Sequence, residues 1–317
     1  MINTSEPQDR IMDRTLLRSK FIKRFGSDPE TIRDIKDIEK IEQIDADERF
    51  PCQSPNEALM LASQAFPQAT AISFLPNGSV SDVPINWTYK EYQEEVYRAA
   101  NMFHSLGLRP DQSVIFLLPN VPQFLFGLWG AQLAGIAAPI NPYLEVEHIA
   151  SIAKSANAKI LVTLAPSQPG GEDLWNKAMK AKSIASDIQQ IIVIGDSQDD
   201  YSSSWDQATR AQPSDRLIFD RPISGTEIAS FFHTGGTTGA PKLAQHTHRR
   251  QVLNVCQMQI TGPRGKEKNE FADCDVILCT LPLFHVNAVF VTSLNAIVGA
   301  GQVVLAGPNG FRNPQLI

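Results

Sequence analysis

The sequence of 317 residues contains little cysteine. Its four cysteines are Cys52, Cys256, Cys274 and Cys279. No two of them have the C-x-x-C spacing of zinc and redox motifs, and no secretory leader precedes them. This usage predicts reduced thiols in a cytoplasmic protein and argues against a small secreted domain held together by disulfides.

The sequence also lacks an apolar run that could cross a membrane. Residues 113–144 are uncharged and long enough, but Pro119, Asn120, Pro122 and Pro139 interrupt them, so we expect a strand, a loop, a helix and a strand. The net charge of −6 offers no basic surface to nucleic acid or to an anionic membrane. Peripheral membrane contact stays open, because a fatty substrate would come from a membrane.

Apolar residues are abundant enough for a large core, since 43% of the chain is hydrophobic and 20% is charged. From residue 54 onward, segments of helical periodicity alternate with short apolar segments. The predicted helices are residues 56–65, 89–106, 123–135, 145–156, 172–184, 249–258 and 287–298. The predicted strands are residues 69–74, 113–118, 136–140, 159–163, 190–194, 228–232, 243–248, 276–280 and 302–306.

This alternation predicts an α/β fold. Uninterrupted apolar strands, such as residues 113–118, are typical of a parallel sheet covered on both faces. Successive βαβ units with right-handed crossovers then give doubly wound parallel sheets. Residues 196–222 are polar and irregular, and we expect a flexible insertion there.

Residues 1–53 differ from the rest in being rich in charge of both signs. Two apolar stripes at helical spacing run through them: Leu16, Leu17, Phe21, Ile22 and Phe25, then Ile32, Ile35, Ile38 and Ile41. We expect a solvated, helical N-terminal extension that packs by one apolar stripe. A helix that binds a partner or a membrane surface is the alternative.

Residues 231–242 contain the most informative pattern, F-F-H-T-G-G-T-T-G-A-P-K. Glycines allow positive φ and a close approach of the backbone to a ligand. Consecutive N–H groups in such a turn, together with threonine hydroxyls, form a concave anion site, and a lysine adds a point charge. The pattern predicts a loop that binds a triphosphate; a flexible Gly/Thr connection is the alternative.

The loop is not a Walker A motif, because Pro241 precedes the lysine and Leu243 follows it. It resembles the signature T-S-G-T-T-G-x-P-K-G of the adenylate-forming enzymes, the acyl-CoA synthetase and luciferase superfamily. Thr234, residues 236–239, Pro241 and Lys242 match, whereas Gly235 replaces the serine and Leu243 the final glycine. The resemblance implies that seven residues bind the nucleotide phosphates: Thr234, Gly235, Gly236, Thr237, Thr238, Gly239 and Lys242.

A second stretch, L-P-L-F-H-V-N-A at residues 281–288, follows a predicted strand. Loops of this kind lie at the carboxyl edge of a sheet, where α/β proteins bind ligands. The stretch resembles the family's P-x-F-H motif, which implies a catalytic role for His285. It also implies an acyl and CoA pocket formed by His285, Val286, Asn287 and Ala288. A buried histidine bonded to the local backbone is the alternative.

Metal binding is the least defined feature. His246 and His248 alternate and would share one face of a strand, but zinc needs three or four ligands and no Cys, Asp or Glu cluster stands nearby. Thr247, His248 and Arg249 match a T-H-R segment of the family, for which we expect a structural role. The metal ligands are therefore unknown.

The resemblance implies a two-step reaction that uses ATP, Mg²⁺ and coenzyme A. A carboxylic acid, expected to be a fatty acid, forms an acyl-adenylate, and the CoA thiolate then displaces AMP. The alternatives are an aryl-CoA ligase, a peptide-synthetase adenylation domain, and a non-catalytic nucleotide-binding or scaffolding protein. A P-loop NTPase is disfavoured by Pro241 and by the lack of a clear Walker B strand.

The resemblance covers residues 54–311, the front part of the family's large N-terminal AMP-binding domain. We expect two α/β lobes there, the second starting near residue 225. The family's Y-G-x-T-E segment, ribose-binding aspartate, hinge and small C-terminal domain with its lysine do not occur in this sequence. The expectation is an incomplete domain of a longer enzyme that does not turn over by itself.

Overall fold

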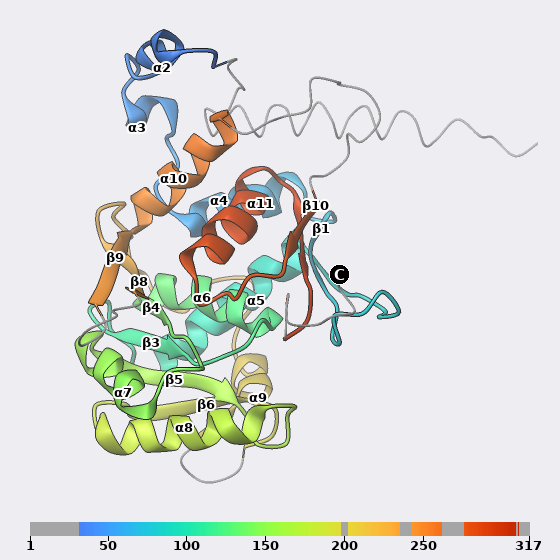
Figure 1. The fold of residues 1–317 in the computed structure, drawn as a ribbon, viewed down its shortest axis with the longest axis vertical. Coiled ribbons are helices and arrows are strands. Elements are labelled where there is room, and N and C mark those ends of the chain that lie inside the picture. The colour runs from blue at the N-terminus through green and yellow to red at the C-terminus, as the bar shows by residue number, and fades with distance from the viewer. Residues whose placement is uncertain (1–31, 198–201, 235–241, 262–275, 309, 311–317) are drawn as a thin grey trace, which may run out of the picture.

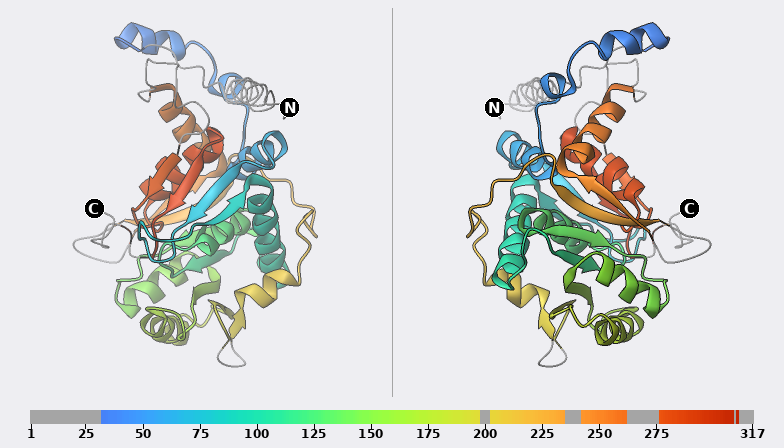
Figure 2. Two further views of the ribbon diagram at one scale, coloured as in Figure 1. Left: turned by 90° about the vertical axis from the view of Figure 1, so that its right-hand side faces the viewer. Right: turned by 90° about the vertical axis from the view of Figure 1, so that its left-hand side faces the viewer.

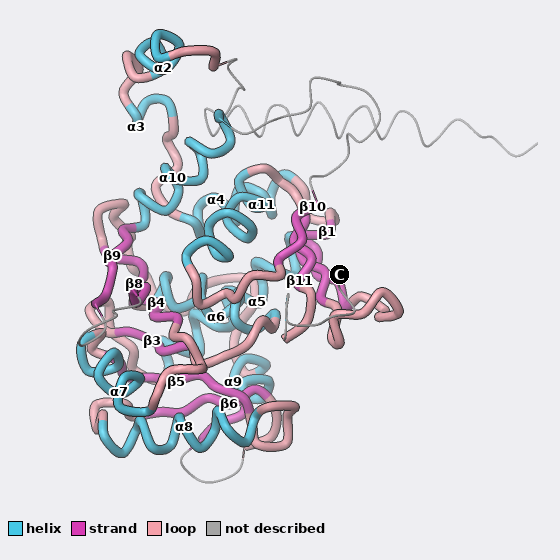
Figure 3. Tube along the Cα trace, viewed as in Figure 1, coloured by secondary structure: helices cyan, strands magenta, loops and turns pink. Residues whose placement is uncertain are grey.

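The structure is a computed structural model that describes residues 32–197, 202–234, 242–261, 276–308 and 310. Its strands form two sheets, visible as two groups in Figures 1 and 3. Across the larger sheet lie β7 (Ser202–Ser204), β6 (Gln190–Ile194), β5 (Ala158–Leu164), β3 (Ser113–Phe116), β4 (Ile136–Pro139), β8 (Ile228–Thr234) and β9 (Lys242–Thr247). Across the smaller sheet lie β10 (Val276–Cys279), β11 (Gln302–Leu305), β1 (Thr70–Phe74) and β2 (Ile85–Thr88).

The α/β fold and its parallel sheets are confirmed, with one antiparallel pair at an edge of each sheet. β1 and β2 are antiparallel, as are β8 and β9. Residues 75–84 and 235–241 connect these pairs, and connections of this length are typical of antiparallel neighbours. The expectation of wholly parallel sheets is therefore corrected at β2 and β9, each of which pairs antiparallel with the strand directly before it in the chain.

Both sheets combine strands from before and after residue 225. β8 pairs with β4 in the larger sheet, and β11 pairs with β1 in the smaller one. The chain thus returns to each sheet after leaving it, and a boundary near residue 225 does not separate the two sheets.

Helices cover the larger sheet on both faces. α6 (Pro122–Ala134) packs on β3 and β4, and α5 (Tyr89–Ser105) packs on α6, β1 and β2, so these two helices lie between the sheets (Figure 1). α7 (Val146–Ser155) and α8 (Gly171–Ile184) pack on β5. The β3-to-β4 and β4-to-β5 crossovers run in opposite directions, and right-handed crossovers then place α6 and α7 on opposite faces.

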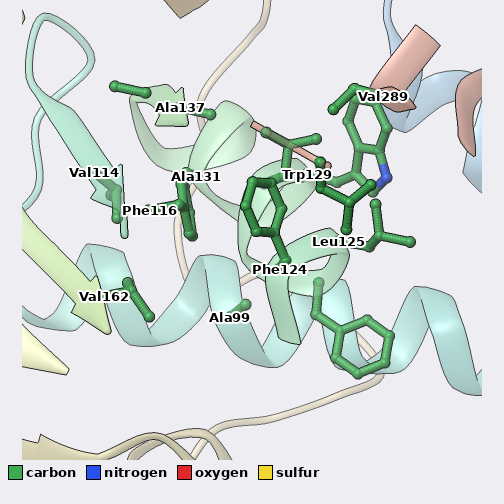
Figure 4. Close-up of a cluster of buried hydrophobic side chains, with 14 of the residues drawn as sticks. Ala99, Val114, Phe116, Phe124, Leu125, Trp129, Ala131, Ala137, Val162 and Val289 are labelled. Atoms are coloured by element: carbon green, nitrogen blue, oxygen red, sulfur yellow. The ribbon is translucent and has the colours of Figure 1, made fainter. Parts of the chain in front are cut away.

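The core is centred on α6, which is apolar on every side. All of its residues except Gln123 are buried, as expected for a helix enclosed by other elements. Figure 4 shows Trp129 of α6 in one cluster with Phe116 of β3 and Val289, which belongs to a helix beyond β10. Each such fully buried large side chain contributes about 1.5–3 kcal/mol to the stability.

The N-terminal extension is described from residue 32. α2 (Ile35–Ile41) buries no residue and projects from the body with α3 (Ala46–Arg49), as Figure 2 shows. Ile32 and Ile41 are partly buried, whereas Ile35 is exposed, so the isoleucine stripe is only partly covered. The predicted stripe from Leu16 to Phe25 lies outside the described residues.

Arg249 fastens this extension to the body. The residue is the second of α10 (His248–Thr261), and only 7% of it is exposed. Its guanidinium donates to the Asp47 carboxylate (2.9 Å) and to the carbonyls of Ala46 (2.7 Å) and Cys52 (2.9 Å). The structural role expected for the T-H-R segment therefore fits the contacts of its arginine.

We expect Arg249→Met to lower the free energy of unfolding by about 2 kcal/mol, because the two carbonyls lose a charged donor while the aliphatic volume is kept. Urea unfolding followed by far-UV dichroism measures this. Arg250→Met is the matched control, since Arg250 is adjacent but exposed. Equal midpoints for the two variants would contradict the role assigned to Arg249.

Two other segments differ from expectation, and a third agrees with it. The insertion predicted at residues 196–222 contains β7 and α9 (Trp205–Arg210), and Trp205 is buried against Phe103. A run of serines does not indicate a strand, because serine is not among the residues enriched in strands and β7 forms by pairing with β6. The helix predicted at residues 287–298 begins as a π-helix, η1 (Ala288–Leu294), and ends as α11 (Asn295–Val298). α4 (Pro55–Ala65) matches its predicted helix within one residue at its start.

Cys52, Cys256 and Cys279 are free and buried. Burial raises the pKa of the Cys256 thiol to about 12 and that of the Cys279 thiol to about 11, so neither is a reactive thiolate. Cys274 lies outside the described residues. Within the described ranges, no helix is both long and apolar enough to cross a membrane.

Candidate active site

Loops from both sheets converge at the carboxyl ends of the parallel strands. Asn120 follows β3, Asn141 follows β4, and Thr234 ends β8; these three strands are parallel, so their carboxyl ends share one edge. Asn120 also hydrogen-bonds to the loop after β10 of the smaller sheet. Both predicted motifs thus lie at one edge, which is where α/β folds bind ligands.

The ends of the predicted phosphate loop face each other across the hairpin of β8 and β9. Thr234 and Lys242 are opposite each other in the register, and the Thr234 hydroxyl donates to the Lys242 carbonyl (3.5 Å). Both residues are exposed. The loop residues Gly235, Gly236, Thr237, Thr238 and Gly239 lie outside the described residues. The hairpin therefore presents one hydroxyl and one ammonium group at the two ends of the loop.

An aromatic group lies on the same face of this hairpin. Phe232 and Thr234 are two residues apart on β8, so their side chains share a face. Phe232, His246 of β9 and Phe290 of η1 contact one another edge to face, with ring centroids 5.3–5.7 Å apart. η1 thus covers the face that presents Thr234, and π-helical turns are frequent at functional sites.

The loop of residues 281–288 places its members differently. Leu283, Phe284 and Ala288 are buried, whereas His285, Val286 and Asn287 are exposed. The His285 ring packs on Phe284, with centroids 4.4 Å apart, and the backbone N–H of His285 donates to the Pro282 carbonyl (3.0 Å). His285 is therefore not the buried, backbone-bonded histidine of the alternative interpretation.

His233 is a second histidine at this edge, and it received no role from the sequence. Its Nε2 accepts a hydrogen bond from the Asn141 N–H (3.0 Å), which anchors β8 to the loop after β4. Burial, and then the charge of the nearby His285, lower the pKa of His233. Burial also lowers the pKa of His285, so both rings favour the neutral form. The sequence feature that could have indicated a role for His233 is its position directly before Thr234.

Comparison with known proteins decides the family. A family model described as AMP-binding enzyme matches residues 61–317. The chain belongs to this family. The resemblance read from the two motifs is thereby confirmed at the level of the family.

Two curated relatives of the chain are CoA ligases. The chain is 45% identical to the marinolic acid–CoA ligase of Pseudoalteromonas sp. (strain SANK 73390), over 94% of this chain and 45% of that protein. It is 30% identical to the crotonobetaine/carnitine–CoA ligase of Escherichia coli O17:K52:H18 (strain UMN026 / ExPEC), over 72% of this chain and 42% of that protein. The chain thus spans less than half the length of these relatives.

A solved structure supports the fold. The anthranilate CoA ligase AuaEII, in complex with anthranoyl-AMP, superposes with a TM-score of 0.67 at 19% identity, covering 80% of this chain and 44% of that one. At this identity the similarity concerns the fold alone.

A depression elsewhere on the chain is lined by residues of α5, α6 and α9. Its volume is about 350 Å³, and Glu95, Arg98, Asp206 and Arg210 lie on its wall. These charges pair among themselves: Arg98 with Glu95 (3.8 Å) and Arg210 with Asp206 (3.9 Å). Neither predicted motif contributes to it, so we assign the candidate site to the carboxyl edge.

The suggestion that His246 and His248 share a face of one strand is wrong. β9 ends at Thr247, and His248 begins α10 with its side chain fully buried. His246 instead packs against Phe232 and Phe290. Among the described residues, no group of three His, Cys, Asp or Glu side chains could hold a metal.

His248 makes the stability depend on pH. Neither ring nitrogen has a hydrogen-bond partner among the described residues. Burial, then the charge of Arg221, lower the pKa of His248 from 6.5 to about 4. Because the unfolded chain takes up the proton first, this stabilisation is complete above pH 6.5 and is lost as the pH falls towards 4.

We expect the free energy of unfolding to fall by about 2 kcal/mol between pH 6.5 and 5 through this residue. Urea unfolding at a series of pH values measures the effect. His248→Leu should remove that part of the pH dependence, whereas His148→Leu should keep it, because His148 is exposed on α7. An unchanged pH slope in His248→Leu would refute the assignment.

Proposed function

We propose that the full protein activates a carboxylic acid with ATP and transfers it to coenzyme A. The observation that carries the proposal is the position of Thr234 and Lys242 at the two ends of a family-type phosphate loop, at the sheet edge that also holds His285. The curated relatives act on acids of different chemistry, yet each of the two named above is a CoA ligase. This supports the reaction class more strongly than it supports any one acid.

In the first step of the proposed reaction, an oxygen of the carboxylate attacks the α-phosphorus of Mg-ATP, and the bond to pyrophosphate breaks. Lys242 would neutralise charge on the β- and γ-phosphates, and the hydroxyls of Thr234, Thr237 and Thr238 would donate to their oxygens. Gly235, Gly236 and Gly239 would allow the backbone to approach the phosphates closely. Mg²⁺ would enter as part of the nucleotide complex, because the described residues hold no metal cluster.

In the second step, the CoA thiolate attacks the acyl carbon and AMP leaves. His285 would lie beside this carbon, and its tendency to stay neutral leaves a ring nitrogen able to accept a proton. Val286, Asn287 and Ala288 would line the acyl or CoA pocket.

For the acid, we propose an aliphatic, fatty type. Val286, Ala288 and Val289 follow His285 and are small and apolar, which favours a hydrocarbon chain. Val286 is 38% exposed and could contact a ligand, whereas Ala288 and Val289 are fully buried and would only support the wall. Peripheral membrane contact of the full protein fits such an acid and stays part of this proposal.

A second candidate is a nucleotide-binding protein without this chemistry. Gly235 removes one hydroxyl from the signature, and Leu243 is half-buried and packs against the core where the signature has a glycine. This candidate predicts ATP binding without acid-dependent chemistry.

Acid-dependent ATP–pyrophosphate exchange tests both candidates. We would measure it with fatty and aromatic acids, in this chain alone and in the longest protein that its gene encodes. We expect exchange with fatty acids in the longest protein and none in residues 1–317 alone. Exchange only with aromatic acids would overturn the proposal of a fatty acid substrate. ATP binding without exchange in the presence of any acid would favour the second candidate.

A further inference from the structure

We propose that Asn120 is a positioning residue that fixes the loop carrying His285 at the shared edge of the two sheets. The inference deepens the proposed function and rests on it for the role of His285.

The side chain of Asn120 bridges the two sheets. Asn120 is 3% exposed; its Nδ2 donates to the Leu281 carbonyl (2.9 Å), and its Oδ1 accepts from the Leu283 N–H (2.8 Å). An amide supplies a donor and an acceptor at once, which neither a carboxylate nor an apolar side chain does. The loop after β10 is therefore held to the loop after β3 by two hydrogen bonds of opposite direction.

His285 depends on this bridge because its own ring is weakly held. Within the described part of the chain, no hydrogen bond fixes the imidazole, which only packs on Phe284. The His285 backbone is bonded to Pro282, which lies between the two residues that Asn120 holds. The position of the imidazole thus follows from the conformation of residues 281–283.

His233 is a second ring at which a shift of the loop held by Asn120 could be detected. It is anchored on the other side of the site by the Asn141 N–H, and its pKa responds to the charge of His285. Asn120 and Asn141 follow neighbouring parallel strands, β3 and β4, so the two histidines are tied to one rigid edge. A shift of the 281–283 loop would change the environment of both rings.

Asn101 offers a matched control. It is also a buried asparagine whose amide fastens a distant loop, donating to the carbonyls of Pro213 and Arg216 and accepting from the Ile218 N–H, each at 2.9 Å. Its loop contains neither predicted motif. Asn101→Asp and Asn120→Asp therefore remove the same kind of donor from two buried bridges.

The first experiment is NMR of the chain labelled with ¹⁵N-histidine, whose six histidines are assigned with single His→Gln variants. Asn120→Asp should move the imidazole signals of His285 and His233 and shift their titration midpoints, whereas Asn101→Asp should leave both unchanged. If Asn120→Asp does not fold, Asn120→Ser tests the same bridge with a neutral, smaller group. Unchanged His285 signals in a folded Asn120 variant would overturn the proposal.

The second experiment is kinetic and uses the longest protein that the gene encodes. Asn120→Asp should lower kcat about 10- to 100-fold with KM for ATP nearly unchanged, because a small displacement of a catalytic group is costly. Equal losses in Asn101→Asp and Asn120→Asp would show that Asn120 is only structural. If Asn120→Asp shifts the His285 signals but the unaltered protein shows no exchange activity, the bridge is supported and the proposed function is refuted.

Discussion

Replacing Lys242 by alanine in the longest protein that the gene encodes is expected to lower acid-dependent ATP–pyrophosphate exchange by about 10²- to 10³-fold, the cost of losing one preorganised charge that faces developing negative charge. Lys242 is exposed, begins β9 and lies opposite Thr234, at the point where the predicted phosphate loop ends. Its ammonium would lose no buried contact on removal, so the fold should persist. The loss should fall mainly on kcat, because the β- and γ-phosphates gain negative charge as the bond to the α-phosphorus breaks.

The measurement needs a second lysine as a control. Lys90 is exposed on α5 and pairs with Glu94 at 3.8 Å, outside the candidate site. Lys90→Ala should keep wild-type exchange, and both variants should keep native far-UV dichroism. Wild-type exchange in Lys242→Ala would remove the phosphate-binding role assigned to the loop.

Much of the fold could be predicted because its elements are encoded locally. The strand at residues 190–194 was predicted with its observed bounds, since Gln190 is followed by four consecutive apolar residues, the pattern of a covered strand. The start of α5 was also predictable, because Thr88 and Glu91 form a capping box there. The short strand β7 carried no comparable local signal, because its three serines are not among the residues enriched in strands.

The residues of the candidate site also differ in whether the sequence could predict them. Thr234, Lys242 and His285 could be predicted because their motifs are short and continuous, and the position of ligand sites at carboxyl edges brought them together. Asn120 and His233 could not be predicted from the sequence, because the residues to which they hydrogen-bond lie 161 and 92 residues away. Periodicity also cannot distinguish a π-helix from an α-helix at η1, because the difference lies in the backbone bonding.

The largest expected loss of stability comes from a substitution at the contact between α5 and α6. Gly130 of α6 faces the backbone of α5: a Cβ at this position would lie 2.8 Å from Ala99 Cβ, 2.9 Å from Ala100 N and 3.0 Å from Val96 O. These atoms belong to a helix held between two sheets and cannot rotate away. Gly130→Val should therefore lower the free energy of unfolding by about 3 kcal/mol or more.

A comparison with Gly127, one turn earlier on α6, separates backbone crowding from helix propensity. A Cβ at Gly127 would lie 2.5 Å from the Phe116 ring and 3.1 Å from the Trp205 ring, so it would crowd buried side chains rather than the backbone of another helix. Both Gly→Ala changes gain about 1 kcal/mol of helix propensity, so this gain cancels when the two variants are compared. The crowding against the α5 backbone remains, and Gly130→Ala should be the less stable of the two in urea unfolding. Equal stability of the two alanine variants would mean that α5 can move away from α6, and the close approach of the helices would not be what holds the core together.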